Sequence, residues 1–154
     1  MTAIELYRKT LREIVKEYGV KKVLEIGVEK GVSTEVFCEA GCEVIGVDIQ
    51  DLGYKHPNLK FVKENASVFL PKVIPGECDL IFLDAFYDYE RLEYDVPLCW
   101  KLLKSGGVLI FNEYIDFAEH RDGEVRRFVH DWAHKNGINF KVYPLRNGFA
   151  LCEK

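Results

Sequence analysis

The stretch VLEIGVEKGVST, residues 23–34, decides the fold of this chain. It begins as a short apolar run typical of a buried strand, and it passes through Gly27 and Gly31 to Ser33 or Thr34, where a helix can start. A glycine lets the backbone turn close to a ligand, and the free N–H groups of the helix that follows favour a carboxylate. The stretch therefore predicts a strand, a ligand-binding loop and a helix.

The spacing of this loop distinguishes between kinds of ligand. A dinucleotide loop reads GxGxxG, so that its glycines cradle a pyrophosphate. Here Glu29 stands two positions after Gly27, and a carboxylate there repels a pyrophosphate. The spacing favours a ligand with an ammonium or sulfonium group, while an ordinary tight turn without a ligand is the alternative that the loop alone leaves open.

The rest of the chain alternates between strand-like and helix-like segments. Strands are expected at residues 21–28, 42–49, 59–66, 78–86 and 108–114, and helices at 1–19, 33–41, 66–74, 89–103 and 125–135. Gly106-Gly107 should end the helix over 89–103, and a hairpin is expected over 139–154 with its turn at Arg146-Asn147-Gly148. The pattern predicts one α/β domain over residues 1–154 without a separate cap domain. Its sheet should be Rossmann-like and doubly wound, mostly parallel with an antiparallel C-terminal hairpin strand.

Composition and charge limit the kinds of partner and the cellular location that we expect. The net charge of −4 argues against a polyanion, so no nucleic acid is expected. No apolar run approaches the roughly 20 residues that span a membrane, and the charged N-terminal segment is unlike a signal peptide. The five cysteines lack the CxxC pairs of a zinc site and indicate reduced thiols in a cytoplasmic protein.

Two further strand ends add candidate ligand-binding residues. Asp48 ends the strand over 42–49, where a carboxylate can accept hydrogen bonds from both hydroxyls of a ribose. Asn65 and Ala66 close the next strand, where the Asn65 amide would meet an adenine edge. A helix N-cap at Asn65 is an equally good interpretation.

From Val23 onward the chain resembles a class I S-adenosylmethionine-dependent methyltransferase. VLEIGVEKGVST resembles the first motif of that family, VIGVDI (44–49) its ribose strand, and LLKSGGVLIF (102–111) the approach to its fifth strand. The resemblance implies S-adenosylmethionine as cofactor, with Glu25 near its amino group and Asp48 on its ribose. The cofactor-binding residues that it implies are Glu25, Gly27, Val28, Gly31, Asp48, Ile49, Asn65, Ala66 and Asp84. The ten residues 49–58 are too few for the usual second helix, so a loop is expected there.

Residues 80–114 are similar to a branch of small-molecule O-methyltransferases that includes macrocin O-methyltransferase-like enzymes. That branch reads D-G-x-H-x-Y-E followed by D, and later GG…HDY or GG…DDY. The first motif here is Asp84-Ala85-Phe86-Tyr87-Asp88-Tyr89-Glu90 with Asp95 following, and the second is Asn112-Glu113-Tyr114. The similarity implies methyl transfer to a small-molecule acceptor, at an oxygen as the first choice and at a nitrogen as the alternative.

The same similarity suggests catalytic groups. Tyr87 replaces the histidine of the branch, which leaves Asp84 or Glu113 as the catalytic base. Some relatives bind a divalent cation, and Asp84, Asn112 and Glu113 occupy the matching positions, where oxygen ligands would suit Mg²⁺. A homodimer is a further expectation, because a second copy can complete an uncapped pocket. Two alternatives stay open, a cofactor-binding module without catalysis and a different nucleotide-utilising Rossmann-like enzyme such as an NAD oxidoreductase.

Overall fold

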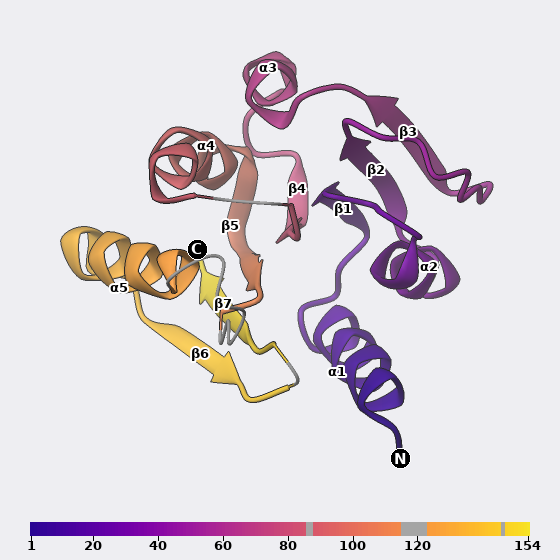
Figure 1. The fold of residues 1–154 in the computed structure, drawn as a ribbon, viewed down its shortest axis with the longest axis horizontal. Coiled ribbons are helices and arrows are strands. Elements are labelled where there is room, and N and C mark those ends of the chain that lie inside the picture. Colours follow the sequence, from indigo (N-terminus) through magenta and orange to yellow (C-terminus); the bar gives the residue numbers. More distant parts are fainter. Residues whose placement is uncertain (86–87, 115–122, 146) are drawn as a thin grey trace.

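The computed structural model describes residues 1–85, 88–114, 123–145 and 147–154. In this part of the chain the strands form one sheet in the order β3-β2-β1-β4-β5-β7-β6 (Figure 1). Neighbouring strands from β3 to β5 are parallel, and β7 pairs antiparallel with both β5 and β6. The strand bounds are β1 Lys22–Ile26, β2 Glu43–Asp48, β3 Leu59–Lys63, β4 Cys78–Leu83, β5 Leu103–Asn112, β6 Phe140–Tyr143 and β7 Phe149–Glu153. The predicted fold class is confirmed, including the antiparallel C-terminal hairpin.

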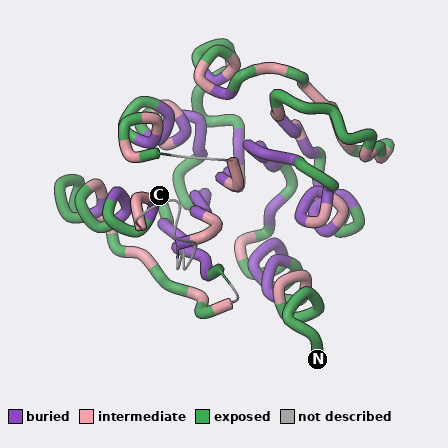
Figure 2. Tube along the Cα trace, in the orientation of Figure 1, coloured by how far each residue is buried: buried purple, intermediate pink, exposed green. Residues whose placement is uncertain are grey.

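Helices cover both faces of the sheet. Their bounds are α1 Ala3–Glu17, α2 Val32–Glu39, α3 Ala66–Phe69, the 3-10 turn η1 Leu70–Lys72, α4 Tyr89–Leu102 and α5 Glu124–Asn136. Helices α1 and α2 lie on one side, and α3, α4 and α5 lie on the other (Figure 1). Successive strand residues alternate between two buried clusters, as Val23 packs toward α1 and α2 while Leu24 packs toward α4. The central strands are accordingly buried (Figure 2).

Helix α1 is fixed at both ends. The Thr2 hydroxyl accepts a hydrogen bond from the Glu5 backbone N–H at 3.2 Å, and the Glu5 carboxylate accepts one from the Thr2 N–H at 2.6 Å. Leu11 and Ile14 are buried against the sheet, and Tyr18 caps the last turn. This helix therefore holds its side chains in a defined position beside the carboxyl end of β1.

The predicted start of the last parallel strand is wrong. Gly106-Gly107 does not end α4, because β5 begins at Leu103 directly after the helix. The Gly106 N–H donates to the Lys154 carbonyl at 2.7 Å, and the Lys154 N–H donates to the Gly107 carbonyl at 2.9 Å. Pairing with the end of the chain thus keeps both glycines in the sheet.

Three other expectations concern local features. Residues 49–58 form no helix, as predicted. All five cysteines are buried and free of disulfides, also as expected. Phe86, Tyr87 and the turn residue Arg146 lie outside the described residues. Among the residues that the structure does describe, no helix has the length and apolar character of a membrane span.

Candidate active site

Two adjoining hollows lie where the carboxyl ends of β1, β2, β4 and β5 meet. The first, of about 450 Å³, is bounded by the loops after β1 and β2 and by the start of α3. The second, of about 240 Å³, lies between α1 and the ends of β5 and β7. Glu29 and Asp84 line both hollows. The site is therefore two compartments that meet at these two carboxylates, at the edge where α/β sheets bind ligands.

Gly27 brings the β1 loop against the end of β4. Its φ is +89°, and a Cβ atom there would lie 2.3 Å from the Asp84 carbonyl oxygen. The Gly27 N–H also donates to the Val47 carbonyl at 2.8 Å. Only glycine permits this approach, because other residues rarely adopt such a φ and have no space for a side chain. The floor of the first hollow depends on it.

Glu25 lies beneath the loop and is completely buried. It accepts hydrogen bonds from the hydroxyls of Ser33 and Thr34, the latter at 2.5 Å. Burial raises the pKa of Glu25 to about 8, an effect that the two hydroxyls oppose and that the charges of Asp84 and Asp48 increase. The helix predicted to start at Ser33 or Thr34 begins at Val32, with Gly31 as the N-cap of α2.

Asp48 holds the other side of the same loop. Its Oδ2 accepts from the N–H groups of Val28 at 2.9 Å and Glu29 at 3.0 Å, and its Oδ1 accepts from Gln50 at 3.0 Å. Partial burial alone would raise the pKa of Asp48, but these backbone donors outweigh it and hold the pKa below its ordinary value. Since a carboxylate offers about four acceptor sites, Oδ1 keeps capacity for a ligand.

The side-chain oxygen of Asn65 makes hydrogen bonds within the protein. Its Oδ1 accepts from the Ser67 N–H at 2.9 Å, as the N-cap of α3, and from Arg91 Nη2 at 2.5 Å. The N-cap interpretation is confirmed, and an adenine contact by Asn65 stays a prediction.

Five of the predicted cofactor residues line the first hollow, namely Gly27, Asp48, Ile49, Ala66 and Asp84. Glu25, Val28, Gly31 and Asn65 do not line it; the first three are buried, whereas Asn65 is exposed. At Gly31, a Cβ atom would lie 2.4 Å from Cγ of Tyr54, so that glycine makes room for a tyrosine ring from the loop after β2. Sequence reasoning missed the lining residues Gln50, Leu52, Glu64, Ala85 and Arg91, of which Gln50 and Leu52 closely follow Asp48.

The predicted catalytic and metal residues Asp84, Asn112 and Glu113 all line the second hollow. Asn112 Nδ2 donates to Asp84 Oδ1 at 2.6 Å. For the two side chains to share a cation, the Asn112 amide would have to turn its oxygen instead of its N–H₂ group toward Asp84. Among the described residues, no three His, Cys, Asp or Glu side chains are grouped to hold a metal ion. This pair therefore fits a hydrogen bond better than a shared cation.

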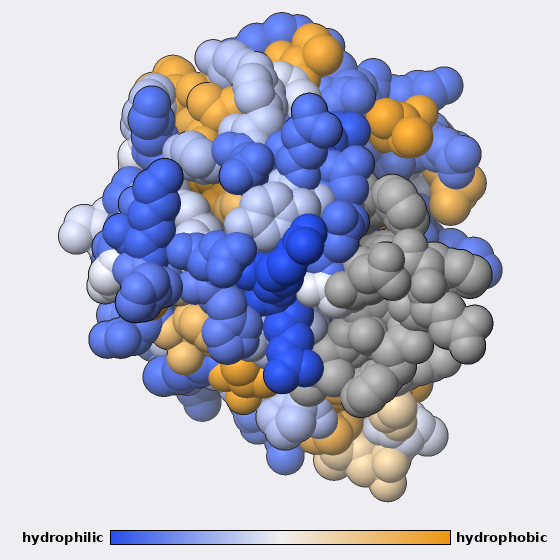
Figure 3. All heavy atoms as spheres, turned by 60° about the vertical axis from the view of Figure 1, so that its left-hand side comes forward, coloured by the Kyte–Doolittle hydropathy of each residue, from blue (hydrophilic) through white to orange (hydrophobic). Residues whose placement is uncertain are grey.

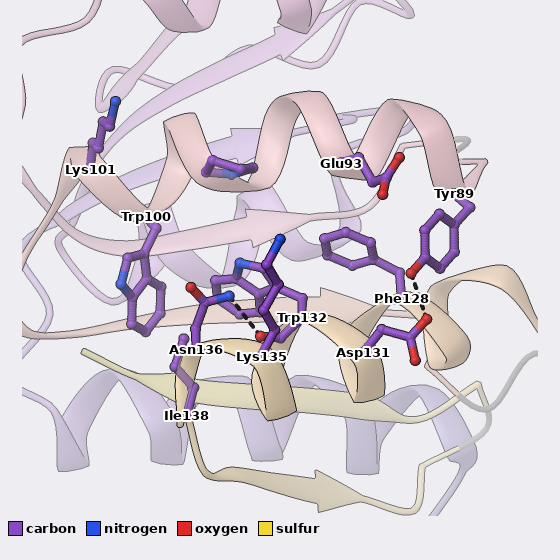
Figure 4. Close-up of a pocket in the computed structure, with 11 residues that line it drawn as sticks. Tyr89, Glu93, Trp100, Lys101, Phe128, Asp131, Trp132, Lys135, Asn136 and Ile138 are labelled. Atoms are coloured by element: carbon purple, nitrogen blue, oxygen red, sulfur yellow. Dashed lines mark hydrogen bonds between the residues drawn. The ribbon is translucent and has the colours of Figure 1, made fainter.

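A third hollow, of about 410 Å³, lies between α4 and α5 (Figure 4). Trp100 and Trp132 meet edge to face across it with centroids 5.1 Å apart, and the Tyr89 hydroxyl donates to Asp131 at 2.5 Å. None of the strand-end carboxylates lines it. The face shown in Figure 3 is mainly hydrophilic, with its visible apolar residues in separate groups. We interpret this hollow as a helix-packing feature.

The sheet is mostly parallel, with a glycine loop after β1, an acid at the end of β2 and a carboxylate directly after β4. This arrangement is that of a class I methyltransferase fold. Residues 24–114, more than half of the chain, match the family described as a methyltransferase domain. The chain belongs to this family.

Solved structures share the fold over almost the whole chain. A Podospora anserina methyltransferase bound to S-adenosylhomocysteine has a TM-score of 0.74 and 18% identity, covering 96% of this chain and 77% of that one. The O-methyltransferase TomG from Streptomyces achromogenes, in complex with S-adenosylmethionine, has a TM-score of 0.72 and 20% identity, covering 96% of this chain and 78% of TomG. An S-adenosylmethionine-dependent methyltransferase from Archaeoglobus fulgidus has a TM-score of 0.71 and 18% identity, covering 98% of this chain and 94% of that one. No protein with a curated description matches the chain.

Proposed function

We propose that this chain transfers a methyl group from S-adenosylmethionine to an oxygen of a small molecule. The observation that carries the proposal is the pair of hollows that meet at Glu29 and Asp84. One compartment can hold a cofactor and the other an acceptor, with the reacting atoms at their junction. The bound S-adenosyl ligands of the Podospora and TomG structures support this choice of cofactor.

The first hollow suits the cofactor. Asp48 would accept a hydrogen bond from the ribose, Ile49 and Ala66 would contact the adenine, and Gly27 would let the methionine part approach the backbone. When bound, the cofactor supplies a methyl group on a sulfonium, which is already reactive. The protein contributes the alignment of that methyl with the acceptor.

The second hollow suits a small acceptor. Its volume of about 240 Å³ admits only a small molecule or the reacting end of a larger one. As the acceptor oxygen forms its bond to the methyl, its proton moves to the carboxylate of Asp84 or Glu113, and S-adenosylhomocysteine leaves. The hydrogen bond from Asn112 orients the Asp84 carboxylate for that role.

Isothermal titration of the purified protein with S-adenosylhomocysteine tests the cofactor. We expect saturable heat, and tighter binding of NADH would instead favour a dinucleotide enzyme. Incubation with S-adenosylmethionine labelled on its methyl and a metabolite extract tests the reaction. Label transferred to small molecules supports an enzyme, while cofactor binding without any transfer favours a module that only binds.

Three finer expectations stay proposals. Mg²⁺ at Asp84, Asn112 and Glu113 would show as a loss of transfer after chelation. A homodimer would show in light scattering. A cytoplasmic location rests on the sequence alone.

Asp48→Asn should weaken the binding of S-adenosylhomocysteine about tenfold, which corresponds to about 1.4 kcal/mol. The amide replaces one acceptor oxygen by an N–H₂ group that faces backbone donors, so both the ribose contact and the loop suffer. Asp51→Asn is the matched control, since Asp51 accepts from Gly53 at 2.9 Å in the next loop turn but does not line the hollow. Titration calorimetry should separate the two, and equal affinities would contradict a cofactor role for Asp48.

A further inference from the structure

Glu29 lies in the loop after β1, at the junction of the two hollows. Of the residues that the structure describes, only Glu29 and Asp84 line both hollows. The Asp84 carboxylate accepts a hydrogen bond from Asn112 at 2.6 Å. Within the described part of the chain, no hydrogen bond or ion pair engages the Glu29 carboxylate. Glu29 therefore offers an acceptor group, not used by the protein itself, where the proposed cofactor and methyl acceptor meet.

The backbone of Glu29 has a left-handed conformation, with φ at +46°. This conformation is strained for a residue with a side chain, because its Cβ atom comes too close to a carbonyl oxygen, whereas glycine adopts it freely. Asp48 Oδ2 accepts from the N–H groups of Val28 at 2.9 Å and Glu29 at 3.0 Å, and the Gly31 N–H donates to the Val28 carbonyl at 2.8 Å. These bonds hold the loop without using the Glu29 side chain. Local structure would thus favour glycine here, so the carboxylate calls for another explanation.

A positive charge lies at this junction when the proposed cofactor is bound, because the methyl is carried on a sulfonium. A carboxylate attracts such a charge more strongly where the ligand has displaced water, since screening is then weaker. Among the described residues, Arg91 is the only basic side chain that lines either hollow, and it donates to Asn65 at the start of α3. No basic side chain of this set therefore competes with a sulfonium for Glu29.

We propose that Glu29 distinguishes the charged cofactor from its neutral product, because its carboxylate attracts the sulfonium and loses that attraction once the methyl has left. The inference rests on the proposed function. As the acceptor oxygen forms its bond to the methyl carbon, the bond from that carbon to sulfur breaks. The electron pair of the broken bond stays on sulfur, which becomes a neutral thioether, and the acceptor proton moves to Asp84 or Glu113 as described above. Glu29 thereby favours the exchange of S-adenosylhomocysteine for new S-adenosylmethionine.

The attraction is strongest before the methyl moves, so it serves binding and product exchange and does not lower the barrier of the chemical step. S-adenosylmethionine and S-adenosylhomocysteine share the same amino-acid and nucleoside parts and differ in the methyl and its charge. A residue that contacts only the shared parts would affect both ligands equally. The ratio of the two affinities therefore reports on the charge at sulfur, and it can be measured without a known acceptor.

Glu29→Gln keeps the size of the side chain and removes its charge. Titration calorimetry with each ligand gives the affinity for S-adenosylmethionine divided by that for S-adenosylhomocysteine. This ratio should fall roughly fivefold in Glu29→Gln, as for the loss of one partly screened charge pair. The affinity for S-adenosylhomocysteine should change by less than about twofold.

Two further measurements separate charge from shape. Raising the salt concentration from about 50 mM to about 500 mM should lower the wild-type ratio and change that of Glu29→Gln less. Glu29→Gly removes both the charge and the left-handed strain, so it should show the same fall in the ratio together with a melting temperature raised by a few degrees. Glu39→Gln is the matched control, since Glu39 is the exposed last residue of α2, lines neither hollow and should keep the wild-type ratio.

The possible outcomes separate the two proposals. An unchanged ratio in Glu29→Gln overturns the role of Glu29. An equal weakening of both ligands in that variant also overturns it, because the side chain then only shapes the site. The role fails as well if Glu39→Gln lowers the ratio as much, since the effect then belongs to the net charge of the protein. If the wild-type protein binds neither ligand, the proposed cofactor fails instead.

Discussion

Gly27→Ala should lower the free energy of unfolding by about 3 kcal/mol and weaken cofactor binding about a hundredfold or more. The added methyl would lie 2.3 Å from the Asp84 carbonyl oxygen and 2.8 Å from the Ala85 nitrogen. Both are backbone atoms at the end of β4, so no rotamer change relieves the overlap. The loop after β1 must move away, which opens the floor of the first hollow.

The matched control is Gly41→Ala. Gly41 has a similar φ of +85°, but no atom lies within 4 Å of the position of its Cβ. It should cost only the backbone strain, about 1–2 kcal/mol, and leave cofactor binding unchanged. Chemical denaturation and calorimetry measure both effects. If the two variants lose the same stability and keep the same affinity, the close approach of Gly27 to β4 has no functional role.

The sequence predicted the sheet well because its signals are local. The apolar runs of β1, β2 and β4 each lead to a glycine or an acid in the sequence. In the structure Asp48 is the last residue of β2, and Gly27 and Asp84 directly follow β1 and β4. The carboxyl ends of parallel strands meet at one edge. Asp48 and Asp84 were therefore expected at one site, and they line the same hollow.

The features that the sequence missed depend on long-range contacts. Gly106 stays in β5 because it pairs with Lys154 at the end of the chain, and no local pattern reports that pairing. Gly31 reads as a ligand-binding glycine, but the Tyr54 ring from another loop lies against it. Tyr7 has the spacing of a packing residue. Only the packing of α1 against Phe149 places it in the wall of the second hollow.

The stability of the protein should depend on pH through Glu25. Its pKa is about 8 in the folded protein, against 4.5 for an unperturbed side chain. Between these values the folded state keeps a proton that the unfolded chain releases. The free energy of unfolding should therefore fall as pH rises from about 5 to 8, by roughly 4 kcal/mol from this group alone, and level off above that range.

Glu25→Gln should remove this pH dependence, because its amide does not ionise. Glu39→Gln, at an exposed position near the end of α2, should keep the wild-type slope. The window from pH 5 to 8 suits Glu25, because Asp48 and Cys38 titrate outside it. The pKa of Asp48 is lowered, so Asp48 loses its proton below this window, and the pKa of Cys38 is raised to about 11, so Cys38 loses its proton above the window. Denaturant titrations at several pH values give the free energy of unfolding of each variant as a function of pH. The difference between two variants removes the contribution of the histidines, which both variants share. Parallel curves for wild type and Glu25→Gln would mean that Glu25 is ionised in the folded protein at neutral pH, and that its two hydroxyl partners suffice to hold a buried charge.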